Sequence, residues 1–125
     1  MHDQRKVLII DDEIDLCLLL KSYFIRKNYD VHISHTLEEG SAQLKYLQPD
    51  IIFLDNNLPD GLGWASAPKL ANSFPNTYIV LISAFHPEVP QMPENAHFQM
   101  IEKPISLSDL DKQFTETPSQ QVNQQ

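Results

Sequence analysis

The chain has 125 residues, of which 42% are apolar, and a formal net charge of −8. This length and apolar share favour one compact domain with a single core over a disordered chain. Because an acidic surface repels phosphate backbones, the composition excludes direct nucleic-acid binding through a basic face of this segment. The apolar runs are too short for a membrane span, and the polar start lacks the pattern of a signal peptide. The lone cysteine allows no internal disulfide, which is compatible with a reducing cytosol.

Strand and helix patterns alternate along the chain. Apolar or alternating runs predict five strands, at residues 7–10, 29–34, 50–55, 78–82 and 98–101. Apolar residues at helical steps, or capping signals, predict helices at residues 16–24, 37–47 and 64–74 and from Ser106 onward. Strands that are apolar throughout are typical of a parallel sheet that is buried on both faces. The pattern therefore predicts an α/β fold, a doubly wound parallel sheet with helices on both faces.

Proline residues interrupt two of these segments. Pro68 lies inside the third predicted helix and should kink it or delay its start. Between the fourth and fifth strands, Pro90 and Pro93 would each cost about 3 kcal/mol inside a helix. We therefore expect a loop or a single turn, and no helix, at residues 86–96.

Polar side chains stand at the carboxyl ends of the predicted strands. They are Asp11 and Asp12 after the first strand, Asp55 at the end of the third, Ser83 after the fourth and Lys103 after the fifth. In a parallel sheet these ends meet at one edge, so we expect the side chains to lie together. Three carboxylates in one place repel each other unless a cation joins them, and oxygen ligands select a hard cation such as Mg²⁺. With the lysine, the set predicts a phosphoryl-transfer site in which a carboxylate is the nucleophile.

Four short runs of the sequence carry a family resemblance. They are Ile10-Asp11-Asp12-Glu13, Leu54 to Gly61, Ser83-Ala84 and Lys103-Pro104. Together they resemble the signature blocks of response-regulator receiver domains of two-component signal transduction, over roughly residues 6–114. The resemblance implies a flavodoxin-like sheet in the order 2-1-3-4-5. It also implies a cytoplasmic, Mg²⁺-dependent phosphoacceptor rather than an enzyme with its own substrate. The phosphodonor would be a sensor histidine kinase or a phosphotransfer protein, and an effector would act downstream.

By position, the resemblance assigns roles to six residues. Asp11, Asp12 and Asp55 would bind magnesium with the backbone carbonyl of Asn57, Asp55 would be phosphorylated, and Ser83 and Lys103 would contact the phosphoryl group. The Lys103-Pro104 bond would be a cis peptide, which proline makes accessible. The chain would divide into a receiver domain at residues 1–114 and a flexible polar tail or linker at residues 115–125.

Two features depart from the family's pattern. The family's fourth helix falls on the proline-rich segment 85–96, and Met100 replaces its usual aromatic residue on the fifth strand. Methionine fits many cavities, so it makes a poor two-position switch. We therefore expect the loop at 86–96 to respond to phosphorylation by ordering, and the usual dimer through this face not to form. A degenerate receiver that binds its partners independently of phosphorylation is the alternative function.

Two other classes of α/β protein fit the sequence less well. A hydrolase of the haloacid-dehalogenase type needs an aspartate two residues after its nucleophile, where Glu13 follows Asp11. A flavodoxin-like cofactor binder needs a Gly/Ser/Thr-rich phosphate loop, and the acidic run after the first strand has the wrong charge for it.

Several residues outside the strand ends keep a plainer interpretation. His32 and His35 are predicted to be surface residues, and Cys17 a packed or surface thiol. On the first helix, the apolar residues off the core stripe are Ile14, Cys17, Leu18 and Ile25. They are either scattered exposed residues, which are normal, or a contact surface for a partner or a second copy.

Overall fold

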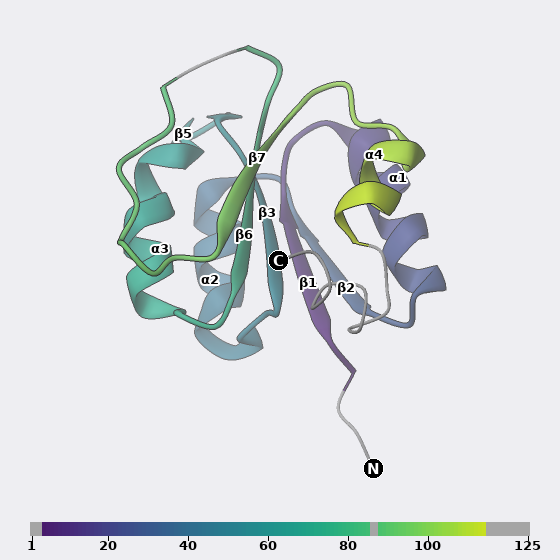
Figure 1. The fold of residues 1–125 in the computed structure, drawn as a ribbon, viewed down its shortest axis with the longest axis horizontal. Coiled ribbons are helices and arrows are strands. Elements are labelled where there is room, and N and C mark those ends of the chain that lie inside the picture. Colours follow the sequence, from purple (N-terminus) through teal and green to yellow (C-terminus); the bar gives the residue numbers. More distant parts are fainter. Residues whose placement is uncertain (1–3, 86–87, 115–125) are drawn as a thin grey trace.

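The computed structural model describes residues 4–85 and 88–114, which form a three-layer α/β fold (Figure 1). The central sheet is parallel and contains β1 (Lys6–Ile10), β2 (Asp30–Ser34), β3 (Ile51–Asp55), β6 (Tyr78–Ser83) and β7 (Phe98–Glu102). Its strand order is β2-β1-β3-β6-β7. Counted along the chain within this sheet, that order is 2-1-3-4-5. The predicted doubly wound parallel sheet is therefore confirmed.

Helices cover both faces of the sheet. They are α1 (Ile14–Arg26), α2 (Leu37–Leu47), the short 3₁₀ helix η1 (Gly63–Ser66), α3 (Ala67–Ser73) and α4 (Leu107–Gln113). The helices α1 and α4 lie on one face, and α2 and α3 on the other (Figure 1). Because successive strand residues point to opposite faces, Val7 and Ile9 join the α1 and α4 core while Leu8 and Ile10 join the α2 and α3 core. This double burial explains why the central strands are apolar throughout.

The helix starts follow the local signals in the sequence. At α4, the Ser106 hydroxyl accepts from the Asp109 N–H and the Asp109 carboxylate accepts from the Ser106 N–H, which confirms the predicted capping box. At α2, the Thr36 hydroxyl accepts from the Glu39 N–H at 3.0 Å. Pro68 occupies the first turn of α3, after η1, so proline delays the α-helix as predicted.

The segment between β6 and β7 contains no helix in its described residues, 84–85 and 88–97. The proline argument is confirmed for these residues, while 86 and 87 lie outside the described part of the chain. Met92 and Ala96 from this segment pack on the α2 and α3 core. On β7, Phe98 and Met100 are exposed, because no helix covers this end of the sheet. How the loop responds to phosphorylation stays a prediction.

A small antiparallel ribbon follows β3, where the sequence predicted only a loop. It pairs β4 (Asn57–Leu58) with β5 (Gly61–Leu62). Gly61 turns the chain with φ of +148°, a conformation that side chains rarely adopt. The Asp60 carboxylate accepts from the backbone N–H groups of Leu37 and Glu38 at 2.9 and 3.0 Å, which ties the ribbon to the start of α2.

Two further expectations from the sequence concern the polar tail and the absence of a membrane span. The polar tail predicted at residues 115–125 lies outside the described residues. Within the described part, no helix is both long and apolar enough to cross a membrane.

Candidate functional site

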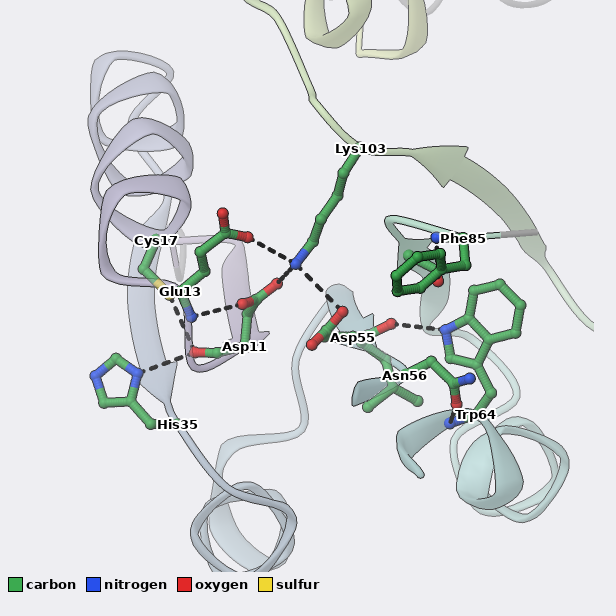
Figure 2. A network of polar contacts seen from close by, with 11 residues as sticks. Asp11, Glu13, Cys17, His35, Asp55, Asn56, Trp64, Phe85 and Lys103 are labelled. Atoms are coloured by element: carbon green, nitrogen blue, oxygen red, sulfur yellow. Dashed lines mark hydrogen bonds and ion pairs between the residues drawn. The ribbon is translucent and has the colours of Figure 1, made fainter. Parts of the chain in front are cut away.

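The carboxyl ends of the parallel strands bring the predicted side chains to one edge of the sheet. Asp11 follows β1, Asp55 ends β3, Ser83 ends β6 and Lys103 follows β7. Asp11, Asp55 and Ser83 are buried, which is unusual for such polar groups. Figure 2 shows Lys103 reaching from the end of β7 toward the carboxylates of Asp11 and Asp55. The sheet thus joins residues that are far apart in the sequence.

Three carboxylates at this edge can share one cation. Asp11, Asp12 and Asp55 each offer an oxygen, and the three oxygens lie within 4.8 Å of one another. No other group of three potential metal ligands of this kind occurs among the described residues. The Asp11 carboxylate is fully buried, and its Oδ2 atom has the Lys103 ammonium as its charged neighbour. Three carboxylate oxygens this close together fit a small hard cation such as Mg²⁺.

Lys103 is the positive charge that faces this cluster. Its Nζ atom lies 2.8 Å from Glu13 Oε1, 3.0 Å from Asp11 Oδ2 and 3.3 Å from Asp55 Oδ1. Burial by itself lowers the pKa of Lys103, but hydrogen bonds to Glu13 and Asp11 outweigh burial and raise it. The ammonium therefore stays charged at neutral pH. The contact with Glu13 was not predicted from the sequence.

Burial and neighbouring negative charge make two carboxyl groups of the cluster less acidic. Burial, followed by the negative charge of Asp11, raises the pKa of Asp55 from 3.8 to about 6, against the opposing effect of Lys103. Burial likewise raises the pKa of Asp11. Without a cation, the charged cluster is thus destabilised first by burial and then, at Asp55, by repulsion from Asp11, and a divalent cation would offset both.

The turn that carries Asp11 is held by several short contacts. The Glu13 N–H donates to Asp11 Oδ1 at 2.7 Å, and the Asp11 N–H donates to the Ser34 carbonyl at 3.0 Å. The Asp11 carbonyl accepts from the Cys17 thiol at 3.3 Å and lies 2.9 Å from His35 Nδ1 (Figure 2). Sequence reasoning gave Cys17 and His35 no part in the site, and no local signal marks them.

Cys17 also requires a correction. The sequence placed it with exposed apolar residues of the first helix, but it is 2% exposed and lies in the α1 core. Burial raises the pKa of its thiol to about 12, so the thiol is not a nucleophile at neutral pH. On the helix, residue 17 lies at the border of the core stripe. Only the packing of α1 on β1 decides whether its side chain is buried or exposed.

Trp64 supports the other side of Asp55. Its Nε1–H donates to the Leu54 carbonyl at 3.1 Å, and its backbone N–H donates to Asn56 Oδ1 at 3.1 Å (Figure 2). The Gly63 N–H donates to the Asn56 carbonyl at 2.9 Å. These contacts fix the chain on both sides of Asp55, and the sequence did not predict them.

The remaining predicted positions adjoin the same edge. Asn57 begins β4, two residues after Asp55. The Ser83 hydroxyl accepts from the Phe85 N–H at 3.2 Å. The Lys103-Pro104 peptide is cis, as the resemblance implied.

Comparison with known proteins identifies the family. Residues 7–115 match the response regulator receiver domain family. This chain is a receiver domain of that family. It is 29% identical over 106 residues to the transcriptional regulatory protein YvcP of Bacillus subtilis, covering 82% of this chain and 44% of the relative. With YpdB of Escherichia coli it shares 32% identity over 108 residues, covering 84% and 44%. The receiver domain thus spans less than half the length of these relatives.

Solved structures share the fold. A receiver domain protein from Methanospirillum hungatei superposes with a TM-score of 0.77 at 22% identity, covering 98% of this chain and all of that one. The response regulator TrrA from Thermotoga maritima, solved in complex with Mg²⁺ and BeF, gives a TM-score of 0.75 at 20% identity, covering 90% and 97%. The receiver fold is therefore shown by structure as well as by sequence.

Proposed function

We propose that this receiver domain is a Mg²⁺-dependent phosphoacceptor and that Asp55 is the phosphorylated residue. The observation that carries the proposal is the position of the Asp55 carboxylate, beside the carboxylates of Asp11 and Asp12 and 3.3 Å from the ammonium of Lys103. This arrangement supplies a nucleophile, a cation site and a fixed positive charge, which are the parts that phosphoryl transfer to a carboxylate requires.

The proposed roles follow from the position of each group. Asp11, Asp12 and Asp55 would hold Mg²⁺ together with the Asn57 carbonyl, and the cation would neutralise charge on the phosphoryl oxygens. An Asp55 oxygen attacks phosphorus, and the bond from phosphorus to the donor breaks. Lys103 then stabilises a phosphoryl oxygen by its charge. The Ser83 hydroxyl would donate to another phosphoryl oxygen.

The phosphoryl group would come from a phosphohistidine on a sensor histidine kinase or a phosphotransfer protein. The domain then acts as a cytoplasmic signalling switch that catalyses only the formation and loss of its own aspartyl phosphate. Two relatives, YvcP and YpdB, are named transcriptional regulatory proteins and are more than twice as long as the matched region. An effector domain or protein that reads the phosphorylated state is therefore part of the proposal. A degenerate, phosphorylation-independent receiver is not favoured, because all three carboxylates and Lys103 are present and juxtaposed.

Labelling by a small phosphodonor tests this function directly. Acetyl phosphate with Mg²⁺ should add the mass of one phosphoryl group to the intact protein, and EDTA should prevent the addition because the carboxylates then lack their cation. Mg²⁺ with beryllofluoride should also raise the melting temperature by several degrees, since a ligand bound only to the native state stabilises it. Intact-mass spectrometry and thermal denaturation are the measurements. If acetyl phosphate adds no mass and beryllofluoride has no effect, the domain is the degenerate receiver.

The exposed apolar side chains of α1 suggest where a partner binds. Ile14, Leu18 and Ile25 are 57%, 56% and 51% exposed, so these three predicted surface positions are confirmed while Cys17 is not. Leu18→Glu should slow phosphoryl transfer from a histidine kinase at least about tenfold, because a charge would be desolvated in the contact. Labelling by acetyl phosphate should not change. Equal kinase rates for the variant and the unmodified protein would leave Ile14, Leu18 and Ile25 as ordinary exposed residues.

A further inference from the structure

Glu13 differs from the other carboxylates that contact Lys103. Its contact is the shortest, at 2.8 Å from Lys103 Nζ to Glu13 Oε1 (Figure 2). Its side chain is 58% exposed, whereas those of Asp11 and Asp55 are 0% and 4% exposed. Glu13 is also outside the trio of carboxylates that can share a cation. It is therefore a fourth carboxylate at the site, with no role in the proposed chemistry.

The backbone fixes Glu13 in this position. Its N–H donates to Asp11 Oδ1 at 2.7 Å, and its carbonyl accepts from the Cys17 N–H at 3.1 Å. Glu13 thereby stands immediately before α1, and its exposed side chain extends toward Lys103 (Figure 2). The contact joins two residues that are 90 positions apart, so it depends on the folded edge of the sheet.

The three contacts use all of the N–H donors of one ammonium group, so a phosphoryl oxygen would have to replace one of them. An ammonium has three N–H donors, and Glu13, Asp11 and Asp55 stand at ion-pair distance from it. A cation shared by Asp11, Asp12 and Asp55 would neutralise two of these competitors. Glu13 would keep its full charge. Once the cation is bound, Glu13 is thus the main group that draws Lys103 away from Asp55.

We propose that Glu13 is a positioning residue. It holds the ammonium of Lys103 by their ion pair and opposes the movement of this ammonium to the phosphoryl group. The inference rests on the proposed phosphoacceptor function. It adds that Glu13 competes with the phosphoryl group for Lys103. Phosphorylation then requires Lys103 to exchange a contact with Glu13 for one with a phosphoryl oxygen. Without Glu13, Lys103 is free to bind that oxygen, so the phosphorylated state is more stable.

Beryllofluoride affinity at saturating Mg²⁺ measures this competition. Trp64 is the only tryptophan, and its ring donates to the carbonyl of Leu54, next to Asp55, so its fluorescence can report binding. Glu13→Gln should tighten beryllofluoride binding by about threefold to tenfold, as expected for the loss of one partly exposed ion pair. Glu13→Asp keeps the charge but is one methylene shorter, so it should also tighten binding if the contact itself matters.

Asp15 provides the matched control for charge. It lies on the same cavity as Glu13 and Lys103 but makes no ion pair with Lys103. Asp15→Asn removes the same charge and should leave beryllofluoride affinity within about twofold of the unmodified protein. Melting temperatures without ligand should stay close for all three variants, since these side chains are outside the core.

Each outcome decides between defined alternatives. Equal affinity changes in Glu13→Gln and Asp15→Asn, with none in Glu13→Asp, would show a general charge effect and overturn the proposal. Weaker beryllofluoride binding by Glu13→Gln would show that Glu13 assists Lys103 and would overturn it as well. If the unmodified protein itself does not bind beryllofluoride, the proposed function has failed, which is a separate result.

Discussion

Asp55→Asn should abolish labelling by acetyl phosphate, because the side-chain amide is a poor nucleophile. Asp55 ends β3, which is the position at which the resemblance to receiver domains puts the phosphoacceptor. Intact-mass spectrometry with Mg²⁺ should show no phosphoryl addition for the variant. Asp15→Asn, the control with the same chemical change, should be labelled fully. Stoichiometric labelling of Asp55→Asn would mean that another carboxylate is the phosphoacceptor.

The same substitution should stabilise the cation-free protein. Burial and the nearby Asp11 charge raise the pKa of Asp55 to about 6 in the folded state, from an ordinary value of 3.8. A raised folded pKa contributes stability below pH 4, and this contribution is lost as the pH rises through about 6. At pH 7 the charged Asp55 therefore lowers the free energy of unfolding by up to about 3 kcal/mol. Chemical denaturation in EDTA should show Asp55→Asn as the more stable protein at pH 7, with a difference that shrinks toward pH 4. A variant that is less stable at pH 7 would contradict the account of repulsion in the cluster.

Gly63→Ala should have the largest effect on folding of any small substitution near the site. A Cβ atom on Gly63 would lie 2.1 Å from the Asp55 carbonyl oxygen, and 3.1 Å from the side chains of Leu54 and Leu58. The Asp55 carbonyl belongs to the backbone of β3, so it cannot move aside without displacing Asp55, the proposed phosphoacceptor. We expect a loss of about 3 kcal/mol or more in the free energy of unfolding, or a chain that does not fold.

Gly40→Ala is the control for this substitution. The three atoms nearest to its Cβ would be side-chain atoms of Ile10, the nearest at 2.6 Å, and alanine favours the helix in which Gly40 lies. The expected change is within about 1 kcal/mol, measured by urea denaturation of both variants. A Gly63→Ala protein as stable as Gly40→Ala would show that the loop after β3 can move independently of Asp55.

The parallel strands of the sheet and the members of the site follow largely from local patterns in the sequence, whereas the strand order came from the resemblance to receiver domains. Solid apolar runs such as Ile51 to Leu54 predict buried parallel strands, since residues that face both ways must be apolar on both sides. Parallel strands end at one edge, so the positions of Asp11, Asp55 and Lys103 after their strands predict that they lie together. Proline chemistry likewise predicted the non-helical segment before β7 and the late start of α3, because a missing N–H acts locally.

Other features depended on contacts that no local pattern encodes. The contact between Glu13 and Lys103, the contacts of Cys17 and His35 with the Asp11 carbonyl, and the Trp64 hydrogen bond to Leu54 all cross between separate elements. Each needs a particular loop path and side-chain rotamer, which the packing of the elements on the sheet determines. The side of Cys17 and the short ribbon of β4 and β5 were misjudged for the same reason. The sequence alone determined which charges meet at the sheet edge, whereas the tertiary structure decided which of them contact Lys103, because ion-pair distances depend on the packing of elements distant in the chain.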